Sequence, residues 1–595
     1  MRECILRGIP GEDFFWFWIC SWTEEESKFA RLIDEGAGMR RGDAAEQKES
    51  QREVTNGAHE MRRWGYAAWV VAIGAFAVLH AMHLRADFPN GSPWIFDWAK
   101  FTDEGWYGNA AARAHLFGNW YVAGDFNPAV ALPVWPFVEW VLYFFTGVRV
   151  EAARGLAIAC FFASLMLSYL LVRASGKNLH HADQRQSAGP PPRWMGLLAV
   201  TLVVTSPFLY CFSRLAILEP MQTLLTLLVL NLAVRLGKMK RPLLASGWIG
   251  FLFALMMLTK TTSLFLAPAV GWAILAPQWD RKRQAMKCAL VAVLKAAATY
   301  GVWMIVVASL GLMKDYKYFF FVNKYEKPPG MTWPLVSLWW SLHGLLWVDH
   351  SLVLLAGGVA VTAAIVWRSE WGRSLWRDPL FGCSLWAVAG YVLFMTIQNH
   401  PQPRYFAVPA FFCFFVVTLG AGRLVQQAGV ARWIGGAVLA LASGAAAVHG
   451  IQTASYAMHP EYTFVNAAEE LTQYIDAHPN GKRLMVSISG DEITLLTHLQ
   501  TICDDFGTED LAPKLAQYQP GWYASWNDMD PGTLLDLHMN YSVEQVATFH
   551  AFDDPDRDLL VLFKLHPLLP GAERDPDDPA MKAPMQGDRI DVPVE

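Results

Sequence analysis

Long runs of apolar residues follow one another along most of this chain, and they restrict it to the folds open to a membrane protein. A helix needs about 20 mostly apolar residues to cross a bilayer whose hydrocarbon core is about 30 Å thick. Only 17% of the residues are charged, against about 25% in soluble domains. The runs that are long enough lie at 65–84, 149–172, 194–212, 221–236, 244–259, 262–278, 288–311, 349–368, 380–397, 405–423 and 432–450. They predict an all-α polytopic membrane domain with about eleven transmembrane helices.

Lys and Arg residues cluster in five of the segments that border these runs. The segments contain "MRRW", "RASGKNLHHADQRQSAGPPPRW", "RLGKMKRP", "DRKRQAMK" and "WRSEWGRSLWRD". Short loops rich in Lys and Arg stay in the cytoplasm, and all five share one side if the short apolar piece 130–147 does not cross. We therefore expect an interfacial or re-entrant helix at 130–147. The alternative, that it crosses and a neighbouring run does not, stays open.

The composition changes after Gly450. "KRLMVSIS", "GWYASW" and "DLLVLFKLH" are typical of strands, whereas "PEYTFVNAAEELTQYIDAH" and "DEITLLTHL" are typical of helices. This alternation predicts a small α/β domain over 451–572, and the loop charges place it on the periplasmic or extracellular face of the inner (plasma) membrane. Residues 61–450 form the expected membrane domain. The tail 573–595 and the polar segment 1–60 are expected to be disordered, unless 1–60 lies upstream of the true start.

Charge and cysteine usage exclude some classes of function. The net charge is −5, so no basic surface suggests a nucleic-acid partner. The eight cysteines are scattered without a CxxC pair or a zinc-ligand spacing, which argues against a zinc or disulfide framework.

Charged residues instead gather in the loops expected on the outer face. They include the acidic pair Asp103 and Glu104 before Trp106 and Tyr107, and in later loops Asn127, Arg214, Glu219, Lys260, His400 and Arg404. A charge at the bilayer centre costs about 2.5–3.5 kcal/mol, and less toward the interface. Several acids and bases converging on one face therefore indicate a water-filled cavity.

These residue types suit one kind of chemistry. Carboxylates serve either as a proton acceptor or as ligands of a divalent cation such as Mg²⁺, Mn²⁺ or Zn²⁺. Arg and Lys suit a phosphate, and aromatic rings suit a sugar or a lipid headgroup. A base and a phosphate clamp at a membrane surface point to sugar transfer from a lipid-linked phosphate donor.

The motifs also resemble a known group of enzymes. "DEGWY" after the first span, "NPAVALPVWP", "SRLAILEP" and "PRYF" are similar to motifs of the GT-C membrane glycosyltransferases. The most similar group is glycosyltransferase family 39, with the protein O-mannosyltransferases and the lipid A aminoarabinose transferase. The resemblance covers roughly residues 61–450. It implies an inverting transfer from a polyprenyl-phosphate sugar that enters sideways from the bilayer, to a lipid, glycan or protein acceptor.

The resemblance also implies roles for single residues. The catalytic acid of the first outer loop corresponds to Asp103, with Glu104 beside it. The acidic residue of the second outer loop, which follows an Arg in many relatives, corresponds to Glu219 after Arg214. Many relatives have Lys-Pro-Pro where this chain has Asn127-Pro128-Ala129, so this chain departs from the family at Asn127.

From these considerations we take Asp103 and Glu104 as catalytic candidates. The candidates for donor phosphate or substrate binding are Arg404, Lys260, Arg214, Tyr107, Asn127 and His400. Glu219 and Glu104 are the candidate ligands of a divalent cation.

Each of these candidates also has a purely structural interpretation. Asp103 could cap a helix that runs through "EGWYGNAAARAHLF", and Glu104 could stand in its first turn. Tyr107 could anchor the interface, Asn127 could form a turn, and Arg214 could pair with Glu219. Lys260 and Arg404 could extend to the lipid headgroups, and His400 could be a hydrogen-bonded histidine.

Two other classes of function stay open at this point. A lipid or solute transporter would also place charges within the membrane domain, although it would more often show two related halves. A non-catalytic envelope assembly protein would retain the fold with a degenerate site.

Overall fold

The computed structural model describes residues 63–175, 193–322, 330, 332–399, 402–527 and 529–568. The expected disordered segments 1–60 and 573–595 lie outside these ranges. The chain divides into two units, Met1–Val71 and Ala72–Glu595. The second unit contains the helical bundle, the C-terminal domain and every interaction considered below.

All eleven apolar runs of the sequence form helices. The first helix spans Arg63–Ala81. The long helices that follow are α5 (Val150–Ser175), α6 (Arg193–Val204), α7 (Pro207–Ser213), α8 (Leu218–Ala233), α9 (Pro242–Thr259), α10 (Ala267–Leu275), α11 (Lys282–Ser309), α13 (Trp333–Val348), α14 (His350–Ile365), α16 (Pro379–Gln398), α17 (Ala407–Val425) and α18 (Val430–Met458). The predicted all-α membrane domain is confirmed.

Several of these helices are broken, which lowers the number of continuous spans. In the described part of the chain, eight helices are long and apolar enough to cross a membrane, or up to ten if two bent pairs count as one span each. The α6–α7 pair bends by 66° and the α13–α14 pair by 116°. α10 and α11 are joined by η7 (Ala276–Arg281), where Gln278 leaves the helical conformation. The run 349–368 is therefore only the second arm of a bent pair.

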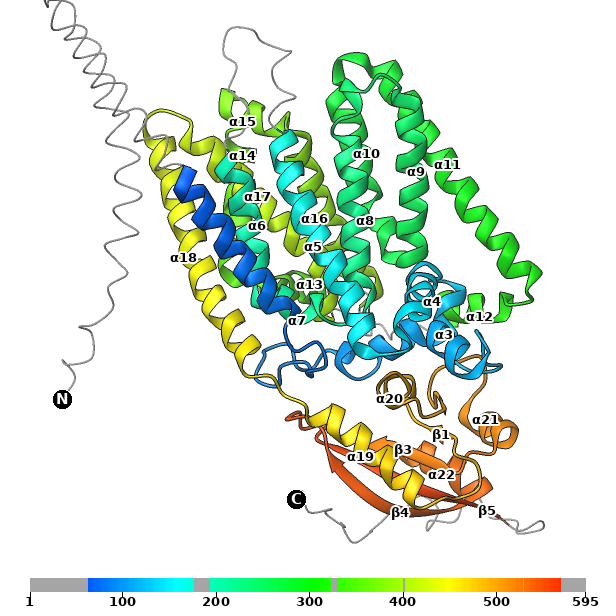
Figure 1. Cartoon of the computed structure of the whole chain (residues 1–595). Coiled ribbons are helices and arrows are strands. Elements are labelled where there is room, and N and C mark those ends of the chain that lie inside the picture. The colour runs from blue at the N-terminus through cyan, green and yellow to red at the C-terminus, as the bar shows by residue number, and fades with distance from the viewer. Residues whose placement is uncertain are drawn as a thin grey trace, which may run out of the picture. The chain divides into compact units, whose positions relative to one another are not determined.

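Short helices lie at one end of the bundle. They are η2 (Trp98–Lys100), α3 (Asp103–Phe117), η3 (Pro128–Val130), α4 (Val134–Thr146) and α12 (Met313–Lys317). Figure 1 shows α3, α4 and α12 at the end of the bundle that faces the C-terminal domain, and α15 (Glu370–Trp376) at the opposite end. We call the former the site end. With 13 residues, α4 is about 20 Å long, too short to cross, in agreement with an interfacial helix.

The C-terminal domain is a five-stranded mixed sheet between helices. The strands β1 (Met485–Val486), β2 (Thr501–Ile502), β3 (Trp522–Trp526), β4 (Tyr541–His550) and β5 (Leu559–Pro567) take the order β2-β1-β3-β5-β4. β1 pairs in parallel with β2 and β3, and β5 pairs in antiparallel fashion with β3 and β4. The helices are α19 (Thr463–Ala477), α20 (Gly490–Thr497), α21 (Leu511–Tyr518) and α22 (Pro531–Asn540). The predicted α/β domain is confirmed, and its helix α19 begins directly after α18.

Alternate residues of the central strands supply two hydrophobic cores. On one face, Trp522 and Leu562 pack with the α19 residue Leu471, and on the other Tyr523 and Phe563 pack with side chains of α21 and α22. This is the period of two expected for strands buried on both faces. Phe101, from the segment before α3, is buried in the α19 core. Leu495 of α20 is buried in the core formed by α3, α4 and α5. The domain and the bundle therefore share their interiors.

Close approach of two membrane helices gives a first testable prediction. A Cβ atom at Gly250 of α9 would lie 2.1 Å from the carbonyl oxygen of Ala292 of α11, whereas one at Gly247 would have no atom within 4 Å. Gly250→Ala should therefore lower the free energy of unfolding by about 1–3 kcal/mol through overpacking. Gly247→Ala, in the same helix, should leave it unchanged or raise it slightly. Thermal unfolding in detergent would test this, and equal shifts for the two variants would contradict it.

Candidate functional site

A buried cluster of charges lies where the loop before α3 meets the start of α17. The cluster begins with Asp97, whose side chain accepts a hydrogen bond from the backbone N–H of Ala99 at 2.8 Å and so caps η2. Five residues later, Asp103 is the first residue of α3 and is 1% exposed. The Thr102 hydroxyl lies 3.2 Å from Asp103 Oδ1. The two carboxylates are thus brought together by the short turn that separates η2 from α3.

Arg404 lies between these two carboxylates. It comes from η9 (Pro403–Phe406), the short helix that leads into α17. Its Nη1 atom donates to Asp97 Oδ1 at 2.5 Å, and its backbone N–H donates to Asp97 Oδ2 at 2.8 Å. Its Nε atom lies 2.8 Å from Asp103 Oδ2. Arg404 is 3% exposed, so this ion triad is held away from bulk water.

A second ion pair completes the cluster. Lys260, between α9 and α10, donates a hydrogen bond to Glu219 in the first turn of α8. The Lys260 Nζ atom lies 4.4 Å from the centre of the Tyr405 ring, and the Arg404 guanidinium carbon lies 5.0 Å from it. Tyr405 thus separates the two cations. Asp103, Glu219, Lys260 and Arg404 form one buried cluster, which is what shared participation in a site requires.

Three polar atoms of the cluster have no hydrogen-bond partner among the described residues. They are Asp103 Oδ2, Arg404 Nε and Glu219 Oε2. The Arg404 Nε–H is not aimed at Asp103 Oδ2 despite the short distance, so this contact is an ion pair without a hydrogen bond. A buried polar atom without a partner costs about 1–3 kcal/mol, and such atoms are retained where a ligand can satisfy them.

Burial makes Asp103 a weaker acid than an exposed aspartate. It raises the pKa of Asp103 to about 6, with Asp97 and Glu219 adding to the increase and Arg404 and Lys260 opposing it. A carboxylate with a pKa near 6 is a stronger base than one near 4 and is still ionised at neutral pH. Asp103 can therefore accept a proton.

Three of the sequence candidates lie outside this cluster and hold backbone or partner helices. Glu104 forms a bidentate pair with Arg154 at 2.8 and 2.6 Å and also accepts from the backbone N–H of Ala216. Arg214 donates to the Tyr210 hydroxyl and to the carbonyls of residues 82 and 83. It does not form the pair with Glu219 that its spacing suggests.

Asn127 closes its own loop. Its side chain accepts from the backbone N–H of Val122 and donates to the Val122 carbonyl at 2.8 Å and to Asp315 at 2.8 Å. This is the turn interpretation of Asn127. Tyr107 is half-buried, and its electrostatic neighbours are Asp103, Tyr405, Arg404 and Glu219. His400 lies outside the described residues.

The carboxylates do not together form a metal site. Both oxygens of Glu104 are bound by Arg154, and Glu219 is paired with Lys260. The part of the chain that the structure describes has no group of three His, Cys, Asp or Glu side chains placed to hold a metal ion. The donor set does not fit the divalent cation predicted for Glu104 and Glu219, and we derive no step through one.

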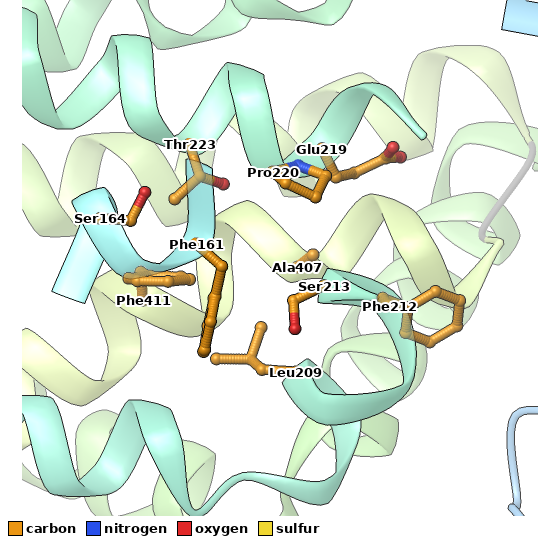
Figure 2. Close-up of a pocket in the computed structure, with 10 residues that line it drawn as sticks. All are labelled: Phe161, Ser164, Leu209, Phe212, Ser213, Glu219, Pro220, Thr223, Ala407 and Phe411. Atoms are coloured by element: carbon orange, nitrogen blue, oxygen red, sulfur yellow. The ribbon is translucent and has the colours of Figure 1, made fainter. Parts of the chain in front are cut away.

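A small cavity adjoins the cluster on the side of the helices. It is lined by α5, α7, α8 and α17 and has a volume of about 20 Å³, room for a single water molecule. Figure 2 shows Glu219 at its edge, with the carboxylate directed away from the aromatic rings of Phe161 and Phe411. Its lining is mainly apolar, with Ser164, Ser213 and Thr223 as polar exceptions.

Sequence reasoning missed several residues of this region. Asp97 stands in "GSPWIFDWAK", where a single acid within an aromatic stretch was the available signal. Arg154 lies inside the apolar run 149–172, where a charge is costly and so indicates a buried partner. Asp491 and Glu492 of α20 gave no signal, because their partners on α3 are almost 400 residues away in sequence.

The arrangement combines three chemical abilities. Asp103 can accept a proton, the guanidinium of Arg404 can bind an anionic oxygen, and the ammonium of Lys260 adds a second positive charge. All are buried, so their mutual interactions and those with a ligand are weakly screened.

Comparison with solved structures identifies the fold. No family model and no curated protein matches the sequence. ArnT from Cupriavidus metallidurans bound to undecaprenyl phosphate is similar over 83% of this chain and 98% of that chain, with a TM-score of 0.52 and 15% identity. The apo state of the same protein gives a TM-score of 0.50, 14% identity and coverages of 84% and 98%. The oligosaccharyltransferase AglB from Archaeoglobus fulgidus gives 0.43, 12%, 84% and 74%. The chain has the fold of the GT-C membrane glycosyltransferases, as its sequence motifs predicted.

Proposed function

We propose that this protein is an integral-membrane glycosyltransferase that uses a polyprenyl-phosphate sugar as donor. It transfers the sugar with inversion to a hydroxyl group of a lipid, glycan or protein acceptor on the outer face of the membrane. The observation that carries the proposal is the buried cluster of Asp103, Arg404, Lys260 and Glu219, with acidic and basic atoms that lack partners. The similar ArnT structure, bound to undecaprenyl phosphate, supports the class of donor.

The step requires a base and a site for the leaving phosphate. The acceptor hydroxyl loses its proton to Asp103 Oδ2 as its oxygen forms a bond to C1 of the sugar. The bond between C1 and the phosphate oxygen breaks, and its electron pair leaves with the polyprenyl phosphate. The transition state has oxocarbenium character, and the charge that develops on the phosphate is stabilised by Arg404 and Lys260. Attack on the face opposite the phosphate gives inversion.

The charges at the other end of the bundle support the sidedness. Exposed basic residues follow α8 and precede α11, and more lie around α15, all at the end of the bundle away from the C-terminal domain (Figure 1). Loops rich in Lys and Arg remain cytoplasmic. The site end, with Asp103 and the C-terminal domain, is therefore assigned to the outer face, with the N-terminus in the cytoplasm.

Replacing Asp103 tests the function directly. Asp103→Asn keeps the size of the side chain but removes the base, so we expect the rate of sugar transfer to fall by roughly 10²–10⁴-fold. The assay uses membranes supplied with defined polyprenyl-phosphate sugars, and mass spectrometry identifies the labelled product. Asp553→Asn, at a side chain 70% exposed on the C-terminal domain, is the matched control.

The outcomes separate the proposal from its rivals. If Asp103→Asn is normally folded and inserted but transfers sugar at the wild-type rate, the catalytic role is wrong. If wild-type protein with each donor gives no product but moves lipid or solute across the membrane, it is a transporter. If neither activity is found, the assembly-protein interpretation gains.

The pH dependence of transfer gives a further prediction. The pKa of Asp103 lies at about 6, and only the deprotonated carboxylate accepts a proton. We therefore expect kcat/KM to rise tenfold per pH unit below about pH 6 and to level off above it. The thermal stability at each pH serves as control. A rate that stays constant from about pH 5 to pH 7, in protein that remains folded, would show that this carboxylate is not the base.

A further inference from the structure

The helix that carries Asp103 begins without a cap of its own. The first N–H groups of an α-helix have no partner within the helix and need one from outside. Thr102 precedes α3, but its side chain makes no capping bond, since its hydroxyl lies 2.9 Å from the Trp98 carbonyl oxygen. The first turn of α3 is buried, so water does not replace the missing partner.

A carboxylate of the C-terminal domain supplies this partner. The backbone N–H of Gly105, the third residue of α3, donates to Glu492 Oε2 at 2.7 Å. Glu492 is 1% exposed and belongs to the first turn of α20. A negative side chain at a helix N-terminus satisfies a free N–H and interacts favourably with the helix dipole.

The contact requires glycine at position 105. A Cβ atom there would lie 2.1 Å from the backbone nitrogen of Glu492 and 2.3 Å from the carbonyl carbon of Asp491. The backbone of α20 therefore lies directly against the first turn of α3. This approach explains how a glutamate side chain reaches the helix end.

Two more bonds fix α20 along α3. Asp491 accepts from Arg113 at 2.8 Å and from Asn109 at 3.0 Å, both further along the same helix. Arg113 also pairs with Asp125 at 2.6 Å. Glu492 is thus held at the helix start by its neighbour in sequence, and its position depends little on its own flexibility.

From these contacts we propose that Glu492 is a positioning residue for Asp103, so that the C-terminal domain takes part in catalysis by capping the catalytic helix. This rests on the proposed function. Asp103 is followed by Glu104, fixed through Arg154, and by Gly105, fixed through Glu492. Without the cap, the first turn frays and the carboxylate of Asp103 loses its fixed direction toward Arg404.

The experiment compares two variants of the full chain in lipid nanodiscs. Glu492→Gln keeps an oxygen that can accept from Gly105 N–H, and Glu492→Ala removes it. We expect Glu492→Ala to lower kcat by roughly 10²-fold, because small displacements of a reacting group have effects of that size, with the donor KM unchanged. Glu492→Gln should restore most of kcat. Glu544→Ala, on the exposed side of β4, is the control.

Hydrogen exchange provides a readout that does not depend on activity. In Glu492→Ala the amides of the first turn of α3 should exchange faster, while those of α19 and of the sheet should not change. Faster exchange in a protein without transferase activity would refute the proposed function and keep the cap. Unchanged exchange would overturn the cap itself. Equal losses of kcat in the Gln and Ala variants, or a higher KM with kcat unchanged, would overturn the positioning role.

Discussion

The contact on which the rest of the site depends is that of Arg404 with Asp97 and Asp103. A buried guanidinium is stable only if its charge is compensated, and removing one partner of such a pair costs about 3–5 kcal/mol. Asp97 supplies two hydrogen bonds and fixes the arginine. Asp103 then supplies an ion pair without a hydrogen bond. Arg404 therefore balances the charge of Asp103 while the oxygen that would take the proton is left without a donor.

The same principle joins the bundle to the C-terminal domain. Glu492 of the domain caps α3 of the bundle, and Asp87 of the bundle caps α19 of the domain by accepting from the N–H groups of Phe464 and Val465. Tyr462, at the start of α19, makes no capping bond of its own. Lys100 adds a buried pair with Asp554 at 2.6 Å. Each part thus completes the secondary structure of the other.

The sequence was informative where a residue's environment follows from its own neighbours. Apolar length predicted every membrane helix, and charges at the ends of those runs predicted Asp103, Glu219, Lys260 and Arg404, which the structure brings together. It could not predict which acid is paired with which base: Glu104, next to Asp103, is bound by Arg154 from a different helix. β4 was missed because a bulge between Gln545 and Ala547 interrupts the alternation of buried and exposed residues. Asp491 and Glu492 were missed because long-range contacts leave no local pattern.

The burial of Phe101 separates the limits of the domain in sequence from its limits in space. By chain order the α/β domain starts after α18, yet one aromatic ring of its interior is contributed by the segment before α3, more than 350 residues earlier. A secreted version cut at the end of α18 would carry a phenylalanine-sized void beside Trp522 and Leu562. Exchange of this domain between related enzymes would likewise succeed only when the loop before α3 travels with it.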